Sequence, residues 1–221
     1  VPEENFLNAS VSFGYNNQST FKDFTSNARN KFDFLGFDDG SRKLPAGFPG
    51  SFQAYNPLSN SDKAKYSAQV KNSYAEISPM AIPSQNHQLT WGKRKDYKNG
   101  ASFGNVVSLS YRNSQNRALA ERKDYEFSGT PFYEYSENIS KYSTNLGLLA
   151  NLAYIKGSNK IAFKNMYNRS FEDNYTSRTG FTTDNIQDVR LNVSDLTTKS
   201  LLNSQLKGEN QLGKKQLKLT W

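Results

Sequence analysis

Hydrophobic and polar residues alternate over an unusual length in the segment 139–155. Every second position from Tyr142 to Tyr154 is mostly apolar, and the positions between them are mostly polar or small. A period of two predicts a β-strand whose two faces meet different surroundings. From Tyr142 to Tyr154 the strand would cover about 40 Å at about 3.3 Å per residue, whereas strands of soluble proteins usually have about 5–6 residues. Tilted by about 45°, it would rise about 28 Å, close to the apolar band of an outer-membrane barrel.

The same alternation predicts six further strands. They cover about 7–24, 87–97, 101–113, 160–173, 187–207 and 215–221. Asn99-Gly100 and Gly157-Ser158 separate consecutive strands and predict tight hairpin turns. The segments that lack the period are about 25–86, 114–138 and 174–187, and we expect them to be long loops. Within 187–207 the alternation changes face at Ser194-Asp195, which indicates a bulge or the point where the strand leaves the bilayer.

The predicted connections alternate between long and short along the chain. Outer-membrane barrels have this asymmetry, with long extracellular loops and short periplasmic turns. We therefore predict an all-β fold, an antiparallel transmembrane β-barrel segment that occupies residues 1–221 as one partial domain. Bacterial single-chain barrels have even strand numbers from about eight upward. About seven strands are thus expected to be a piece of a larger barrel.

The apolar set of each predicted strand is expected to face lipid. The set consists of Val11, Phe13, Tyr15, Leu89, Trp91, Phe103, Val107, Leu109, Tyr111, Tyr142, Leu146, Leu148, Leu152, Tyr154, Ile161, Phe163, Leu202, Leu206, Leu217, Leu219 and Trp221. A charge at such a position costs about 2–4 kcal/mol at mid-depth of the bilayer. The intervening polar positions are expected to line a watery interior.

Composition agrees with this interpretation. A hydrophobic content of 35% and a mean hydropathy of −0.79 are low for a soluble protein with a large core, but the lumen face and loops of a barrel are polar. The net charge of +8 is scattered, with no helix that carries a basic stripe, so no nucleic-acid partner is expected. The absence of cysteine excludes disulfides, thiolate nucleophiles and cysteine metal sites.

Candidate chemistry is confined to the loops. The single histidine, His87, has no evident catalytic partner in the sequence, and Asp38-Asp39-Gly40 lacks the ligand spacing of a calcium loop. We therefore expect no enzyme activity, no metal and no cofactor. Aromatic rings can stack on sugars and flat ligands, so loop residues are candidates for substrate binding, namely Phe34, Phe37, Asp38, Asp39, Arg42, Tyr125, Phe127 and Tyr133. Alternatively, these aromatics pack the loops against one another or against a lid subunit.

Two runs resemble a known family. The opening VPEENFLNAS, followed by SFGYN and STFKDF, resembles the plug-to-barrel junction and first strand of TonB-dependent receptors from Bacteroidetes. FLGFDDGSRKLP at 34–45 is similar to their first extracellular loop, and 145–174 and 200–221 are similar to later barrel hairpins. The resemblance implies a 22-stranded barrel in the bacterial outer membrane that imports a glycan, siderophore or peptide with energy from TonB. It also implies that this chain covers the first third of the barrel without the plug.

The resemblance implies several partners. These are outer-membrane lipid, the remainder of the barrel and its plug, TonB through the missing N-terminal part, and a surface lipoprotein lid or the barrel-assembly machinery. A secreted β-rich adhesin or carbohydrate-binding module is the alternative. That class predicts strands of about six residues and an apolar core between two sheets.

Overall fold

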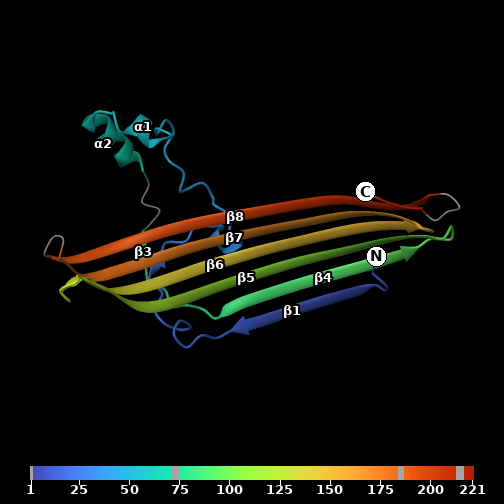
Figure 1. Cartoon of the computed structure of the whole chain (residues 1–221), viewed down its shortest axis with the longest axis horizontal. Coiled ribbons are helices and arrows are strands. Elements are labelled where there is room, and N and C mark those ends of the chain that lie inside the picture. The colour runs from blue at the N-terminus through green and yellow to red at the C-terminus, as the bar shows by residue number, and fades with distance from the viewer. Residues whose placement is uncertain (1, 71–74, 184–186, 213–216) are drawn as a thin grey trace.

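The structure, a computed structural model, describes residues 2–70, 75–183, 187–212 and 217–221. Its main element is an antiparallel sheet, in which seven strands of the described chain lie side by side (Figure 1). In sheet order these are β1 (Phe6–Gly14), β4 (Ser84–Asp96), β5 (Ala101–Tyr125), β6 (Pro131–Lys156), β7 (Asn159–Thr182), β8 (Gln187–Leu212) and β9 (Leu217–Thr220). The predicted all-β, antiparallel character is confirmed.

The four central strands are longer than the sequence predicted. They contain 25, 26, 24 and 26 residues, or about 80 Å each at about 3.3 Å per residue. The loop expected at 114–138 is instead a continuation of β5 and β6 around a turn at 126–130, where the Glu126 N–H donates to the Thr130 carbonyl at 2.8 Å. Likewise β7 and β8 fill most of the loop expected at 174–187. Both faces of these ends carry polar residues, so the period disappears although the backbone ladder continues.

The short turns lie where the sequence placed them. Lys156 pairs with Asn159 across Gly157-Ser158, with Gly157 at φ +57°. In the turn before β5, the Gly100 N–H donates to the Tyr97 carbonyl at 3.0 Å. The strand predicted at 187–207 is longer than expected, because β8 continues to Leu212. Residues 213–216, which include the expected start of the last strand, lie outside the described residues.

No bulge interrupts β8 near Ser194-Asp195. The register between β7 and β8 runs without a shift from Lys160 opposite Glu209 to Thr182 opposite Gln187. The apolar residues that precede Ser194 therefore lie on the opposite face from Leu202, and the expected bulge is wrong. Among the described strand pairs, β5 and β6 shift register at Asp124/Tyr125, beside the turn that joins them.

The register gathers the alternating apolar residues on one face. Directly paired residues of an antiparallel sheet lie on the same side. One row crosses six strands and consists of Ala9, Leu89, Leu109, Leu148, Tyr167 and Leu202. The row on the opposite side consists of Ser12, Asn86, Arg112, Asn145, Ser170 and Lys199. We call these sides the apolar face and the polar face.

Most of the predicted lipid-facing side chains are open to the surroundings. Leu148 is 43% exposed and Leu152 is 39% exposed, so no second layer covers them. Tyr142 is the exception, because it is only 5% exposed. We call the segment between β1 and β4, residues 15–83, the first long segment. The guanidinium carbon of Arg29 in this segment lies 3.8 Å from the centre of the Tyr142 ring. The prediction that Tyr142 faces lipid is therefore wrong. Tyr15 lies one residue past the end of β1 and outside the ladder.

The segment between β1 and β4 folds onto the apolar face at the end of the sheet opposite the short turns (Figure 1). Phe24 and Ala81 from this segment form a small buried core with Tyr142 and Phe171 of the sheet. The segment contains β2 (Ser26–Asn27), the short 3-10 helix η1 (Asp33–Leu35), α1 (Phe52–Tyr55), α2 (Asn60–Gln69) and β3 (Glu76–Ile77).

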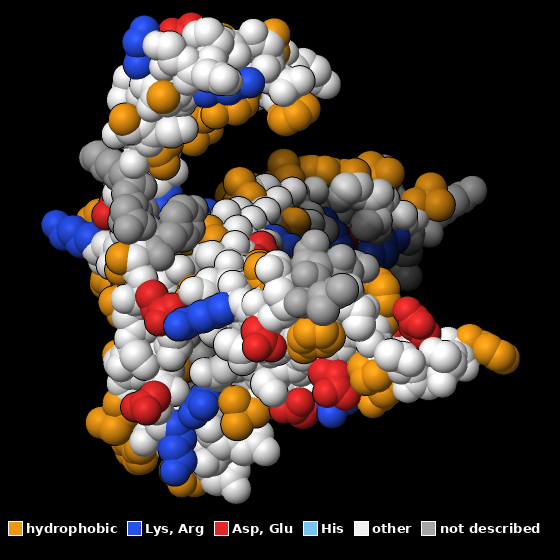
Figure 2. All heavy atoms as spheres, turned by 90° about the vertical axis from the view of Figure 1, so that its left-hand side faces the viewer, with side chains coloured by type: hydrophobic (Ala, Val, Ile, Leu, Met, Phe, Trp, Pro, Cys, Tyr) orange, Lys and Arg blue, Asp and Glu red, His pale blue; other side chains and the backbone are white. Residues whose placement is uncertain are grey.

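The part of this segment that carries α1 and α2 projects from the rest of the molecule, as Figure 2 shows from the loop end. The Phe48 ring contacts the rings of Tyr55 and Tyr66 at centroid distances of 5.7 and 5.4 Å. Ser59 caps α2 by accepting the Asp62 N–H at 3.1 Å. In the described part of the chain, neither helix has the length and apolar character needed to cross a membrane.

Candidate functional site

A cleft of about 450 Å³ lies between the first long segment and strands β7 and β8. Its lining consists of Asp38, Arg42, Lys43, Arg169, Ser194, Leu196 and Thr198. By register, Arg169 and the three β8 residues belong to the apolar face. The cleft therefore forms where the segment around Asp38 to Lys43 lies over that face.

A close backbone contact positions the segment. Gly36 ends η1 at φ +78°, and its N–H donates to the Asp33 carbonyl at 2.9 Å. A Cβ atom at this position would lie 3.2 Å from the Cβ atom of Phe171, so glycine allows both the left-handed conformation and the close approach. Arg169 donates to the Gly36 carbonyl and, at 2.8 Å, to Ser200 Oγ. Its guanidinium carbon lies 4.5 Å from the centre of the Phe37 ring.

Arg42 and Asp33 form the most enclosed ion pair of the cleft. Arg42 Nη1 and Nη2 donate to the two carboxylate oxygens of Asp33 at 2.7 and 2.5 Å, a bidentate geometry. The side chains are 7% and 1% exposed. Hydrogen bonding to Asp33 outweighs burial and raises the pKa of the Arg42 guanidinium. Arg42 Nε is buried and has no hydrogen-bond partner among the described residues.

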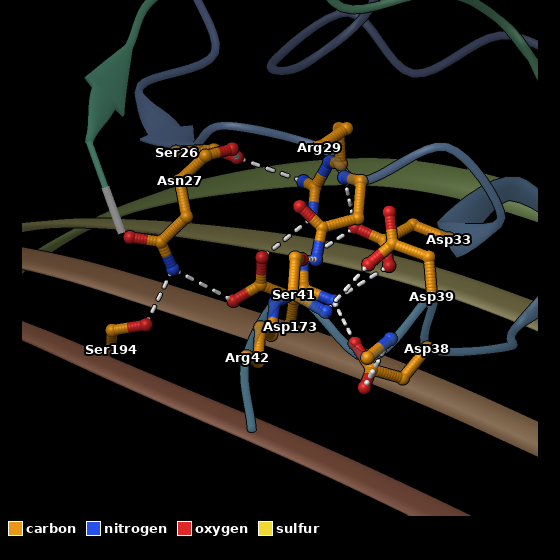
Figure 3. Close-up of polar contacts among 12 residues, drawn as sticks. Ser26, Asn27, Arg29, Asp33, Asp38, Asp39, Ser41, Arg42, Asp173 and Ser194 are labelled. Atoms are coloured by element: carbon orange, nitrogen blue, oxygen red, sulfur yellow. Dashed lines mark hydrogen bonds and ion pairs between the residues drawn. The ribbon is translucent and has the colours of Figure 1, made fainter. Parts of the chain in front are cut away.

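A second ion pair fastens the segment to β7 (Figure 3). Arg29 Nη1 lies 2.6 Å from Asp173 Oδ2, and its Nη2 donates to Ser26 Oγ at 2.8 Å. Asn27 Nδ2 donates to Asp173 Oδ1 at 3.1 Å and also to Ser194 Oγ of β8. Burial is the largest influence on Arg29 and lowers the pKa of its guanidinium, against the attraction of Asp173. Together these bonds fix the position of the segment over two strands.

The structure separates the predicted substrate-binding residues into two places. Asp38 and Arg42 line the cleft, and Phe37 lies at its edge through its contact with Arg169. Phe34 is 52% exposed and is not part of the lining. Asp39 is also exposed, and its carboxylate accepts the Ser41 N–H at 2.9 Å.

The predicted aromatic residues of the second loop lie at the β5–β6 hairpin end instead. Phe127 is fully exposed in the turn, and Tyr125 is the last residue of β5. Tyr133 stacks on Tyr135 with ring centroids 4.7 Å apart. These residues are not among the described lining of the cleft at Arg42, because the expected loop is the turn end of the long β5–β6 hairpin.

Sequence reasoning missed Lys43, Arg169 and the three β8 residues of the cleft. Arg169 carried a usable signal, because it falls in register with the apolar positions Ile161 and Phe163. A charge at such a position is costly in lipid, which indicates local cover by other protein. Ser194 and Thr198 gave no signal, since small hydroxyl residues are common throughout this chain.

The chemistry of the cleft favours an anionic group. Among the described residues, its lining contains three cationic side chains and one carboxylate. His87 lies apart on β4, where its ring contacts Phe13 and Tyr111 at centroid distances of 6.4 and 6.0 Å. Among the described residues, no group of three or more histidine, cysteine, aspartate or glutamate side chains could hold a metal ion.

Comparison of this chain with protein-family models, with curated proteins and with solved structures finds no match.

Proposed function

We propose that this chain forms part of the wall of a β-barrel in a bacterial outer membrane, in a transporter of the TonB-dependent type that imports a large nutrient. The main support is the two-faced sheet, in which one row of apolar residues crosses six strands and a polar row lies behind it. Soluble proteins seldom expose an apolar surface of this extent. In a barrel wall, the apolar face would meet the hydrocarbon outside the barrel and the polar face would meet the water inside it.

The dimensions of the apolar face fit this proposal. From Leu146 to Tyr154 the face covers about 26 Å along β6, which gives a height of about 20 Å at a tilt of about 40°. Tyr154 and Trp221 lie at the short-turn end of the face, and Tyr111 and Tyr167 lie toward the other end. Outer-membrane barrels carry such aromatic girdles at both interfaces. We call the part of the apolar face at the level of Leu146 to Tyr154 the apolar band. The first long segment covers the face beyond this band, toward the loop end.

The sheet edges also favour a larger barrel. β9 pairs with four residues of β8, so most of the outer edge of β8 is unpaired within the described chain. An open edge cannot lie in hydrocarbon, since its backbone groups would lack hydrogen bonds. In the proposed barrel, further strands cover this edge.

Two adjacent leucines provide a matched test of membrane insertion. Leu148 lies on the apolar face and Leu149 on the polar face, and the chain has no native cysteine. Nitroxide labels are attached to Leu148→Cys and Leu149→Cys in the chain embedded in lipid vesicles. We expect the label at 148 to collide with oxygen and the label at 149 to collide with a water-soluble nickel chelate. Equal access of the nickel chelate to both labels would exclude the proposed wall.

Fractionation separates the proposed function from the adhesin or carbohydrate-binding alternative. A secreted module remains in the aqueous phase when detergent is removed. A barrel wall floats with lipid vesicles on a density gradient and resists extraction by alkaline carbonate. A soluble, monodisperse chain without detergent would contradict the membrane proposal.

A further inference from the structure

The charged cleft opens on the apolar face, beside the band that is proposed to meet lipid. Thr198 of its lining lies four residues before Leu202 on the same face of β8, or about 13 Å along the strand. Arg169 lies two residues from Tyr167, which belongs to the apolar row. A ligand in the cleft would therefore be in reach of both the cationic groups and the apolar surface.

The cleft has donors that the protein itself does not use fully. Arg42 Nε is buried and has no partner among the described residues, and the Arg42 side chain is more than nine-tenths buried. Asp38 supplies the carboxylate among the described lining residues, and its Oδ1 lies 3.5 Å from Arg42 Nη1. Asp33 already pairs with Arg42. The remaining cations of the lining are Lys43 and Arg169.

We propose that this cleft binds the phosphate-bearing headgroup of a membrane lipid, whose acyl chains lie along the neighbouring apolar row. This inference rests on the proposed function, because it requires the apolar face to meet a bilayer. Guanidinium and ammonium groups are the usual ligands of phosphate oxygens. The hydroxyl groups of Ser194 and Thr198 add neutral donors at the β8 side.

The position of the cleft favours a lipid over an imported nutrient. A nutrient in the lumen would meet the polar face, where Arg112 and Lys199 lie. Arg169 and Thr198 are on the opposite side of the sheet. A phosphate at the border of the apolar band has water on one side and hydrocarbon on the other, which is the environment of a lipid headgroup.

Binding of a short-chain phosphatidic acid to the full chain in detergent micelles tests the proposal. Lys43→Gln removes one cation from the cleft, and Lys199→Gln removes one from the polar face of β8 as a matched control. Loss of a charge-assisted contact is expected to weaken binding about tenfold. We therefore expect this loss for Lys43→Gln and unchanged affinity for Lys199→Gln. Equal affinity of the two variants would overturn the assignment of the cleft.

Two further probes identify the source of the phosphate. Inorganic phosphate lacks the acyl chains, and short-chain phosphatidylcholine masks the phosphate charge with its own cation. We expect both to bind more weakly than phosphatidic acid. Inorganic phosphate that binds as tightly as phosphatidic acid would overturn the lipid proposal. A chain that does not bind phosphatidic acid would also overturn the lipid proposal. If the nitroxide label at position 148 still reported contact with lipid in that case, the headgroup site would be wrong while the proposed barrel wall would stand.

Discussion

At the residue scale, buried ion pairs hold the first long segment on the sheet. Arg42 with Asp33 stabilises the segment internally, whereas Arg29 with Asp173 joins it to β7. Buried charges are costly unless they are paired and hydrogen-bonded. Asp33 and Asp173 are each only 1% exposed in their side chains. The position of the cleft therefore depends on a few bonds whose loss leaves a charge in a dry environment.

Replacing Arg42 by lysine tests this dependence. Arg42→Lys keeps the charge but loses the bidentate bond to Asp33, so we expect the folded segment to lose about 1.5–3 kcal/mol of stability, the value of a hydrogen bond to a charged group. Limited proteolysis within residues 15–83 measures this loss. The matched control is Arg94→Lys, because the Arg94–Asp96 pair is exposed and contributes little. Equal protease sensitivity of both variants would contradict the structural role of the Arg42 pair.

The contact between Tyr175 and Glu76 predicts a response to alkaline pH. Tyr175 is buried beyond the apolar band and donates its hydroxyl to the Glu76 carboxylate of β3. Burial, followed by this hydrogen bond, raises the pKa of Tyr175 to about 12. The folded state thus favours the neutral phenol, and its contribution to stability is fully present below pH 10 and is lost as the pH rises toward 12.

Tyr175→Phe isolates this effect. The variant lacks the hydroxyl, so its free energy of unfolding is expected to change less between pH 9 and about 12 than that of the parent chain. Chemical denaturation across this range, monitored by tryptophan fluorescence, makes the comparison. Tyr97→Phe, at the exposed turn before β5, is the control. A parent-like pH dependence in Tyr175→Phe would show that another group is responsible.

At the element scale, the regularity of the sheet exceeds what the periodicity of the sequence reveals. Alternation predicted the turn at Gly157 and the face of residues such as Leu148, because there the two faces meet different environments. It failed in 114–125 and 131–138, where both faces carry polar residues and the ladder continues without an apolar side. It also failed for Tyr142, since its cover comes from Arg29, more than a hundred residues earlier. The cleft has the same non-local origin, so only its loop residues Asp38 and Arg42 were found.

Glycine at position 180 marks a close contact between two long strands. Gly180 has φ +151°, and a Cβ atom there would lie 2.0 Å from the Glu134 carbonyl oxygen. Gly180→Ala is therefore expected to destabilise the β6–β7 pairing at the end far from the Gly157 turn by about 1–3 kcal/mol, the usual cost of overpacking. Faster amide hydrogen exchange in 133–137 would report it, with Gly50→Ala in open space as control. Unchanged protection there would show that the strands separate without cost.

At the scale of the whole molecule, the two faces of the sheet differ in polarity and therefore favour different surroundings. The apolar row needs a nonpolar environment, and the polar row behind it needs water. A soluble sandwich would satisfy the apolar row with a second sheet. The described chain provides cover only at the loop end, through the first long segment. The uncovered part of the apolar face is therefore the surface whose environment distinguishes a membrane barrel from a soluble sandwich.

Arginine substitutions at neighbouring positions measure that environment directly. Leu148→Arg places a charge on the apolar face near the Leu146 end of the band, where lipid is expected to make the charge costlier than water does, up to the value of about 2–4 kcal/mol at mid-depth. Leu149→Arg places the same charge on the polar face, beside Ser108 and Met166, and is expected to cost less because water solvates the guanidinium. Reversible unfolding in lipid vesicles, with urea as denaturant, gives both free energies. Similar costs for the two variants, or a lower cost at 148, would mean that the apolar face does not meet hydrocarbon. The adjacent positions share backbone, depth and residue type, so the difference between them reports the medium on each side of the sheet.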